Sequence, residues 1–371
     1  MKIKNAKLYW NGSFVDGSME YGRTITDFGA ADGEGIDLGG ALVIPGLVDV
    51  HTHGAVGADW SDGDESTLPA LAEYYAAHGV TSYAATTMTL KEPELIKAAK
   101  SINALRRPEK GARCAGIHLE GPFISYEKRG AQNPDNLHAP DIDMFKRINE
   151  ASGNRVRLIT VAPEVEGALD FIREASKVCT VSLGHSTADY DTAMRGFEAG
   201  ATHVTHLFNG MEPLHHRKPG LVGAALMANA DVELICDGKH IHPAVINAAY
   251  RMFGEHLVVV SDSLRCAGLP DGEYELGGLP IVMKDGLARL HDGTIAGSST
   301  NLFDELKNLV AFGIPIEHAV YMMTEGAARS IGCFDAIGSL NIGKFADFLV
   351  VDRKLELKAV VIGGELVHGE L

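Results

Sequence analysis

Residues 42–53 read Leu-Val-Ile-Pro-Gly-Leu-Val-Asp-Val-His-Thr-His, an apolar run that ends in two histidines. A short apolar run of this kind is typical of a buried β-strand. Seven similar runs follow, and the sequence predicts strands at 42–50, 81–88, 112–119, 156–161, 179–183, 201–207, 232–236 and 257–261. Helical patterns lie between them at 68–78, 93–106, 165–177, 187–199 and 243–253.

Eight strands that alternate with helices predict a parallel (β/α)8 barrel of the TIM type. A doubly wound sheet is the alternative fold. It would not naturally take eight such units, and it would usually carry a Gly-rich phosphate-binding turn, which this pattern lacks.

The two ends of the chain carry β signals of a different kind. Asn11-Gly12 lies between alternating runs and predicts a hairpin turn, and Gly363-Gly364 does the same near the C-terminus. Neither end is long enough to fold well alone. We therefore expect 1–45 and 341–371 to pair into one small β-sandwich domain, which leaves 46–340 for the catalytic barrel.

Composition excludes several classes of protein. The 371 residues are 46% hydrophobic and 22% charged, as in a globular protein, and the net charge is −16. A nucleic acid or an anionic membrane is not expected as a partner, because both require a basic footprint. There is no apolar run of membrane-spanning length and no apparent secretory signal. Five widely spaced cysteines predict reduced thiols in a cytoplasmic protein.

Potential metal ligands stand where the predicted strands end, which is where barrel enzymes place their catalytic groups. His51 and His53 are two residues apart, so on a strand both point to the same face. Carboxylates and imidazoles also stand at the ends of four other strands: Glu120, His185, His206 and Asp262. Each residue taken alone is compatible with a solvated strand end. Together they suit Zn²⁺ or Fe²⁺ with an open position for an activated water.

His203 precedes His206 by three residues, so on a strand the two side chains face opposite ways. Only one of them can reach the mouth of the barrel. We expect His203 to point into the core or to support another ligand.

Several words of sequence resemble the amidohydrolase superfamily, and within it the deacetylases of N-acetylated amino-sugar 6-phosphates. They are PGLVDVHTH (45–53), EGPF (120–123), GHS (184–186), HLFNGM (206–211), DGKH (237–240), SD (261–262) and DGTIAGS (292–298). The first word marks the superfamily, and the words EGPF, HLFN and DGKH are specific to the deacetylases. The match covers nearly the whole chain in order.

The resemblance implies a set of metal ligands. Glu120, His185 and His206 would hold the main divalent metal, Zn²⁺ or Fe²⁺. His51 and His53 would hold a second one bridged by Glu120, so that one or two metals are bound per chain. Asp262 would act as general base and then as general acid.

The resemblance also implies substrate contacts: Ala131, Gln132, Asn209, Gly210, Arg217, His240, Ile295, Ala296 and Gly297. Arg217 would bind the phosphate of a neighbouring subunit's substrate, so a homodimer is expected. Two positions depart from the family, which often has Ala at position 210 and His at position 132.

The activity implied is hydrolysis of N-acetyl-D-glucosamine 6-phosphate to D-glucosamine 6-phosphate and acetate. The alternatives are the N-acetylgalactosamine 6-phosphate epimer and another amidohydrolase of a small N-acyl substrate. A cyclic amidase would need a lysine at the end of the fourth strand, where the chain reads Thr160-Val161-Ala162-Pro163. A non-catalytic scaffold would have lost metal ligands, and this sequence retains them all.

Overall fold

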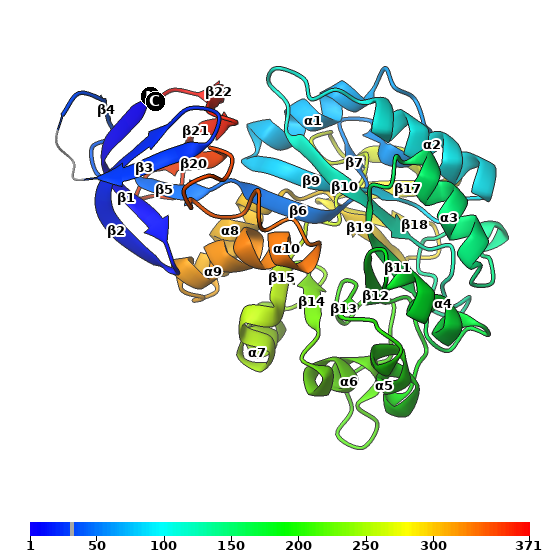
Figure 1. Cartoon of the computed structure of the whole chain (residues 1–371). Coiled ribbons are helices and arrows are strands. Elements are labelled where there is room, and N and C mark those ends of the chain that lie inside the picture. Colours follow the sequence, from blue (N-terminus) through cyan, green and yellow to red (C-terminus); the bar gives the residue numbers. More distant parts are fainter. Residues whose placement is uncertain (30–32) are drawn as a thin grey trace.

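The computed structural model describes residues 1–29 and 33–371, and its central feature is a parallel β-barrel (Figure 1). Eight strands pair in chain order, each parallel to the next. They are β6 (Leu47–Thr52), β9 (Val80–Thr87), β10 (Arg113–Glu120), β11 (Val156–Val161), β12 (Thr180–Leu183), β13 (His203–Val204), β14 (Asp231–Leu234) and β15 (Leu257–Val259). The predicted TIM-type barrel is confirmed.

Residues just beyond the carboxyl end of the last strand, β15, bond to residues within the first strand, β6. The amide of Asp262 donates to the carbonyl of His51 at 2.9 Å, and the hydroxyl of Ser261 donates to the buried carboxylate of Asp49 at 2.6 Å. These bonds fasten the barrel at the end where the candidate ligands gather.

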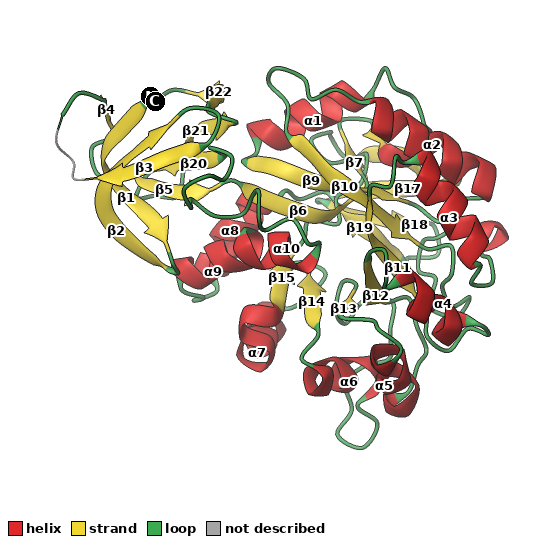
Figure 2. Cartoon of the chain, viewed as in Figure 1, coloured by secondary structure: helices red, strands yellow, loops and turns green. Residues whose placement is uncertain are grey.

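Helices surround the barrel (Figure 2). They are α1 (Leu68–Ala77), α2 (Glu92–Ala104), α3 (Ile142–Ala151), α4 (Ala168–Ala175), α5 (Tyr190–Glu198), α6 (Gly220–Ala228), α7 (Pro243–Phe253), α8 (Leu302–Ala311), α9 (Ile316–Met323) and α10 (Glu325–Ser330). The sequence patterns missed α3, α6 and α8 to α10. Helix α6 is apolar at every position, so it has no amphipathic period to detect.

Helix α5 begins later than predicted, because Asp189 caps it. The Asp189 carboxylate accepts a hydrogen bond from the Thr192 amide at 2.9 Å. The hydroxyls of Ser186 and Thr187, at the predicted start of the helix, donate to Glu164.

Strands from both ends of the chain form one eight-stranded sheet beside the barrel (Figure 1). They are β1 (Lys2–Trp10), β2 (Ser13–Tyr21), β3 (Ile25–Gly29), β4 (Ile36–Asp37), β5 (Leu42–Pro45), β20 (Phe348–Val351), β21 (Leu357–Ile362) and β22 (Glu365–Gly369). Asn11 and Gly12 both have positive φ, 48° and 78°, as the predicted hairpin turn requires. The expected small β domain is therefore present, and its boundaries at 45/46 and 340/341 stay predictions.

The single strand predicted over 42–50 is wrong, because the chain breaks at Gly46 into β5 and β6. A Cβ at Gly46 would lie 2.1 Å from the Thr81 hydroxyl oxygen, so only glycine fits this approach. One residue therefore carries the chain from the terminal sheet into the barrel.

A further sheet, antiparallel throughout, follows the barrel strands, and the sequence patterns did not predict it. It contains β16 (Gly272–Leu276), β17 (Leu279–Lys284), β18 (Leu287–Leu290) and β19 (Ile295–Ser298). The short strands β7 (Gly54–Ala55) and β8 (Ala58–Asp59) pair after β6. Ser298, at the end of β19, bridges to Ser263 just beyond Asp262, which brings 295–297 to the mouth of the barrel.

Two further observations concern the environment of the chain. All five cysteines are free thiols. Among the helices that the structure describes, none is long and apolar enough to cross a membrane.

Candidate active site

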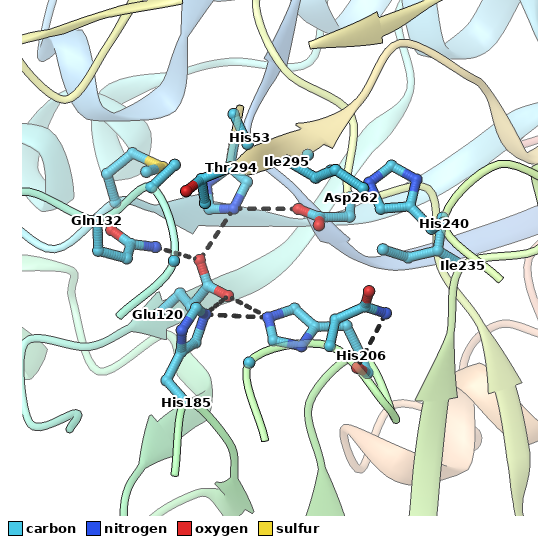
Figure 3. Close-up of a pocket in the computed structure, with 17 residues that line it drawn as sticks. His53, Glu120, Gln132, His185, His206, Ile235, His240, Asp262, Thr294 and Ile295 are labelled. Carbon is cyan, nitrogen blue, oxygen red and sulfur yellow. Dashed lines mark hydrogen bonds and ion pairs between the residues drawn. The ribbon is translucent and has the colours of Figure 1, made fainter. Parts of the chain in front are cut away.

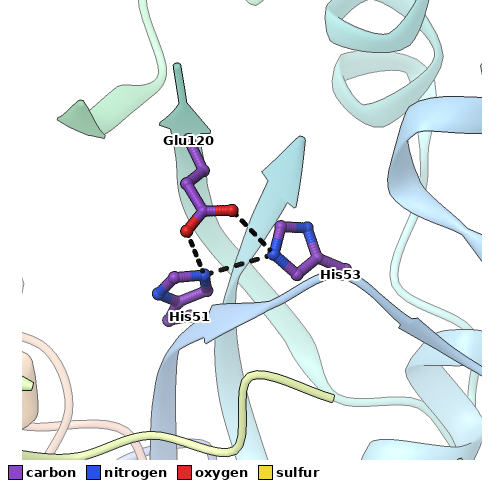
Figure 4. Close-up of side chains that lie close together, drawn as sticks. All are labelled: His51, His53 and Glu120. Carbon is purple, nitrogen blue, oxygen red and sulfur yellow. Dashed lines mark hydrogen bonds and ion pairs between the residues drawn. The ribbon is translucent and has the colours of Figure 1, made fainter. Parts of the chain in front are cut away.

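Glu120, the last residue of β10, lies at the centre of a ring of histidines (Figures 3 and 4). Its Oε1 is 3.0 Å from Nε2 of His185 and 3.0 Å from Nε2 of His206. Its Oε2 is 3.1 Å from Nε2 of His53. Nε2 of His51 is 3.5 Å from Oε1. One carboxylate therefore faces all four imidazoles.

The backbone is strained at three of the residues that face this centre. His185, His206 and Asp262 have φ values of 48°, 27° and 46°, in the left-handed region that non-glycine residues rarely adopt. Such a conformation costs about 1–3 kcal/mol per residue, and it persists where the surrounding structure imposes it. Functional sites are where such strain is commonly found.

His203 and His206 separate as expected, although for a different reason. Strand β13 ends at Val204, so His206 lies beyond it and turns toward Glu120. His203 is fully buried, and its Nδ1 is 3.0 Å from the hydroxyl of Ser182.

The donor set fits a divalent metal. The Nε2 atoms of His185 and His206 are 3.0 Å apart, and those of His51 and His53 are 3.2 Å apart, so each pair faces a common point. Nδ1 of His185 lies 2.7 Å from the Lys128 carbonyl, which leaves its Nε2 lone pair free for a cation. Two buried groups that share Glu120 could each hold an ion: Glu120 with His185 and His206, and Glu120 with His51 and His53.

Asp262 stands beside the second of these groups. Its Oδ1 is 3.4 Å from Nε2 of His53 and 3.5 Å from Nε2 of His51. Burial raises the pKa of Asp262, but the neighbouring His51 and His53 outweigh this and hold the pKa below its usual range. The carboxylate is therefore ionised and can accept a proton.

A cavity of about 190 Å³ opens onto Glu120, His53, His185, His206 and Asp262 (Figure 3). Most of the residues expected to bind substrate line it: Ala131, Gln132, Asn209, Gly210, His240, Ile295, Ala296 and Gly297. Met88, Ile235 and Thr294 also line it, and the sequence did not single these out. Within the described chain, the lining includes no lysine and no arginine.

Both ends of the Gln132 side-chain amide are hydrogen-bonded within the protein. Its Nε2 donates to Oε2 of Glu120 at 2.6 Å, and its Oε1 accepts from the Thr89 amide at 2.8 Å. The side chain therefore orients a candidate metal ligand.

His240 presents one ring nitrogen to the cavity. Its Nδ1 is 2.7 Å from the Asp237 carboxylate, while its Nε2 is buried and has no hydrogen-bond partner within the described residues. An unpartnered polar atom in a cavity lining is available to a bound molecule.

Arg217 lies apart from the cavity, in the loop that leads into α6. Its side chain is exposed, and its guanidinium contacts the neighbouring His216 at 2.7 Å. Within one copy of the chain, the structure does not bring this predicted phosphate ligand to the site.

Glu233, on β14, is a buried carboxylate that the sequence analysis missed. Its Oε2 lies 2.8 Å from Nδ1 of His51. The available signal was an acidic residue inside the apolar run 232–236, since a charge rarely stands in a buried strand without a partner.

Comparisons with known sequences place this site in a family. The model of the family described as "Amidohydrolase family" matches residues 42–367. An N-acetylglucosamine-6-phosphate deacetylase from Bacillus subtilis is 35% identical over 334 residues, which cover 88% of this chain and 84% of the relative. An N-acetylgalactosamine-6-phosphate deacetylase from Escherichia coli O157:H7 is also 35% identical, over 88% of this chain and 87% of the relative.

Solved structures are similar over nearly the full length. An N-acetyl-D-glucosamine-6-phosphate deacetylase mutant from Mycobacterium smegmatis, in complex with N-acetyl-D-glucosamine 6-phosphate, has a TM-score of 0.92 and 31% identity, over 99% of both chains. An N-acetylglucosamine-6-phosphate deacetylase from Thermotoga maritima has a TM-score of 0.90 and 30% identity, over 100% of both chains. Because the family model matches most of this chain, residues 42–367, the chain belongs to the amidohydrolase family.

Proposed function

We propose that this protein hydrolyses N-acetyl-D-glucosamine 6-phosphate to D-glucosamine 6-phosphate and acetate. The observation that carries the proposal is the ring of four imidazoles around Glu120, with an ionised Asp262 beside it, at the base of a cavity. The deacetylases described above supply the substrate class.

Glu120, His185 and His206 would hold one divalent metal, and His51 and His53 a second that shares Glu120. The mixture of imidazole and carboxylate ligands suits Zn²⁺ or Fe²⁺. When bound, such a cation polarises the acetamide carbonyl and lowers the pKa of the attacking water.

Asp262 carries the proton through the reaction. As a carboxylate it accepts the proton of the attacking water, and it then donates that proton to the amine nitrogen as the C–N bond breaks. Nε2 of His240, held toward the cavity by Asp237, is placed to contact the bound sugar. Asn209, Gly210 and the segment 295–297 form the remaining walls.

A phosphate in this cavity needs a cation that the same chain does not provide, since no described lysine or arginine lines it. We propose that Arg217 of a second copy supplies it, so the working unit is a homodimer. The exposed apolar side chains of Leu214, Leu226 and Met227, in the Arg217 loop and in α6, are suited to burial between copies. The free cysteines suit the reducing cytoplasm.

Acetate release tests the function on both epimers of the substrate. Turnover of the glucosamine epimer is expected, with loss of activity on chelation and its return with Zn²⁺ or Fe²⁺. Higher kcat/KM on the galactosamine epimer would reassign the substrate, and activity that survives complete metal removal would refute the mechanism.

A further inference from the structure

Glu233 contacts both of the candidate metal groups with a single oxygen. It is fully buried on β14. Its Oε2 is 2.8 Å from Nδ1 of His51 and accepts a hydrogen bond from the backbone amide of His206 at 3.0 Å. His51 belongs to one group and His206 to the other.

The contact with His51 decides which ring nitrogen can bind a cation. A carboxylate accepts a hydrogen bond only from a nitrogen that carries hydrogen, so Nδ1 is the protonated nitrogen. In the neutral ring that binds a cation, Nε2 then presents its lone pair to the point that it shares with Nε2 of His53, 3.2 Å away. A carboxylate behind a ligating histidine is a common way to orient the ring and raise its basicity.

The contact with His206 acts on the backbone. His206 has φ of 27°, and its Nδ1 has no hydrogen-bond partner among the described residues. The bond from its amide to Glu233 therefore holds this strained residue in the orientation that points Nε2 at Glu120. His185 has its own anchor, the Lys128 carbonyl.

The electrostatic setting of Glu233 is unusual. Within the described chain, its ion-pair partners are imidazoles alone, His51 at 2.8 Å and His203 at 3.9 Å, and its Oε1 has no hydrogen-bond partner. A buried carboxylate is costly without a compensating positive charge. A cation bound through His51 would supply that charge.

A third metal between His51, His118 and Glu233 is the competing explanation, since their ligand atoms also lie close together. It would require His51 to bind cations through both ring nitrogens, and hence to lose its ring hydrogen. Nε2 of His118 is already 2.8 Å from the hydroxyl of Thr160. A hydrogen bond from Nδ1 of His51 to Glu233 needs neither change.

We propose that Glu233 is a positioning residue that sets the metal affinity of this site, and chiefly that of the group formed by His51, His53 and Glu120. The inference rests on the metal groups of the proposed function. It assigns the larger effect to the second group because Glu233 orients the imidazole of His51, whereas it touches only the backbone of His206.

Glu233→Gln tests the proposal. The glutamine side-chain oxygen can still accept hydrogen bonds from Nδ1 of His51 and from the His206 amide, but the negative charge is removed. Metal-free full-length protein would be titrated with Zn²⁺ in competition with a chromophoric chelator. The affinity for the second equivalent is expected to fall by about 10- to 100-fold, the usual effect of losing such a partner. The affinity for the first equivalent is expected to change by less than about threefold.

Glu305→Gln is the matched control. Glu305 is equally buried, and its Oε2 accepts from the Cys236 amide at 3.0 Å. Burial raises the pKa of Glu305 well above its usual range, so glutamine closely imitates the neutral acid. Both Zn²⁺ affinities should be those of the unaltered protein.

Two results would overturn the proposal: unchanged affinity for the second equivalent in Glu233→Gln, or binding of a third equivalent by the unaltered chain. If Glu233→Gln does not fold, ¹⁵N spectra of the histidine rings in the unaltered protein decide. The His51 signals of the Zn²⁺-loaded protein, identified by their loss in His51→Asn, should show hydrogen on Nδ1, and hydrogen on Nε2 in place of Nδ1 would refute the proposal. Zn²⁺ binding as expected without acetate release would refute the proposed function alone.

Discussion

Removing the guanidinium of Arg217 should lower kcat/KM for the phosphorylated substrate and leave kcat/KM for the unphosphorylated sugar unchanged. The cavity holds no lysine or arginine of its own chain among the described residues. The whole chain carries a net charge of −16, which repels a phosphate at long range. A single local cation should therefore have a large effect on substrate binding.

The expected size follows from the contact that is lost. A hydrogen bond to a charged group contributes about 1.5–3 kcal/mol. At about 1.36 kcal/mol for each factor of ten, Arg217→Ala should lower kcat/KM for N-acetylglucosamine 6-phosphate by roughly 10- to 150-fold. Most of this loss should appear in KM, because the phosphate lies away from the bond that breaks.

Acetate release is measured with both the 6-phosphate and free N-acetylglucosamine. The comparison separates a direct contact between Arg217 and the phosphate from the long-range effect of the chain's net charge. Arg195→Ala is the matched control. Arg195 is exposed on α5, and its guanidinium donates to the Thr192 hydroxyl at 3.0 Å. The Arg195→Ala variant removes the same charge from the chain without touching the Arg217 loop, so the kinetics of this variant should be those of the unaltered protein.

A mixture of Arg217→Ala and Asp262→Asn chains tests the shared site directly. Each homodimer lacks one half of every site, whereas a mixed dimer combines Asp262 of one chain with Arg217 of the other. Activity should return in proportion to the mixed dimer formed. Equal losses on both sugars, or no recovery while subunits demonstrably exchange, would refute the cross-subunit contact.

The other predictions concern the reaction centre and stability. Asp262→Asn should retain metal but lose kcat by roughly 10²–10⁴, the usual contribution of a general acid–base group, and kcat within a few-fold of the unaltered protein would contradict its role. Glu120→Ala should purify without metal in either group, because its two oxygens face all four histidines, and full metal content by elemental analysis would contradict the site. Burial lowers the pKa of Lys344 from 10.5 to about 8. Between these values the folded chain binds fewer protons here than the unfolded chain, so stability rises with pH. The free energy of unfolding of the unaltered protein should therefore gain a contribution from Lys344 as the pH rises from 7 to 10, and Lys344→Met should lack that gain. Denaturant unfolding of both proteins checks this, and a stability difference between them that does not change with pH would contradict it.

Local sequence signals were sufficient for the barrel and for most of the residues that gather at its mouth. Alternating apolar runs and helices recur along 42–261, and the polar residues that end those runs are visible without knowledge of the fold. His51 and His53 meet because residues two apart on a strand share a face. In a parallel barrel all strands end at the same rim, so Glu120, more than sixty residues further along, arrives at the same centre.

The tertiary structure decided what depends on contacts between distant segments. The position of Glu233 inside an apolar run signals that it has a partner, but the run does not identify that partner, His51, which is 182 residues away. Gln132 matched a substrate contact by position, yet its amide is held by Glu120 and Thr89. Arg217 matched a phosphate ligand by position, and only the fold places it outside its own cavity.

The division has a physical reason. Hydrophobic periodicity records which face of an element is buried, and this is a property of neighbouring residues. Hydrogen-bond partners depend on how elements pack, and nothing in a residue's near sequence specifies an atom a hundred residues away. The sequence therefore determined the architecture and which residues gather at the rim of the barrel. The packing of the strands decided the hydrogen-bond partners of those residues.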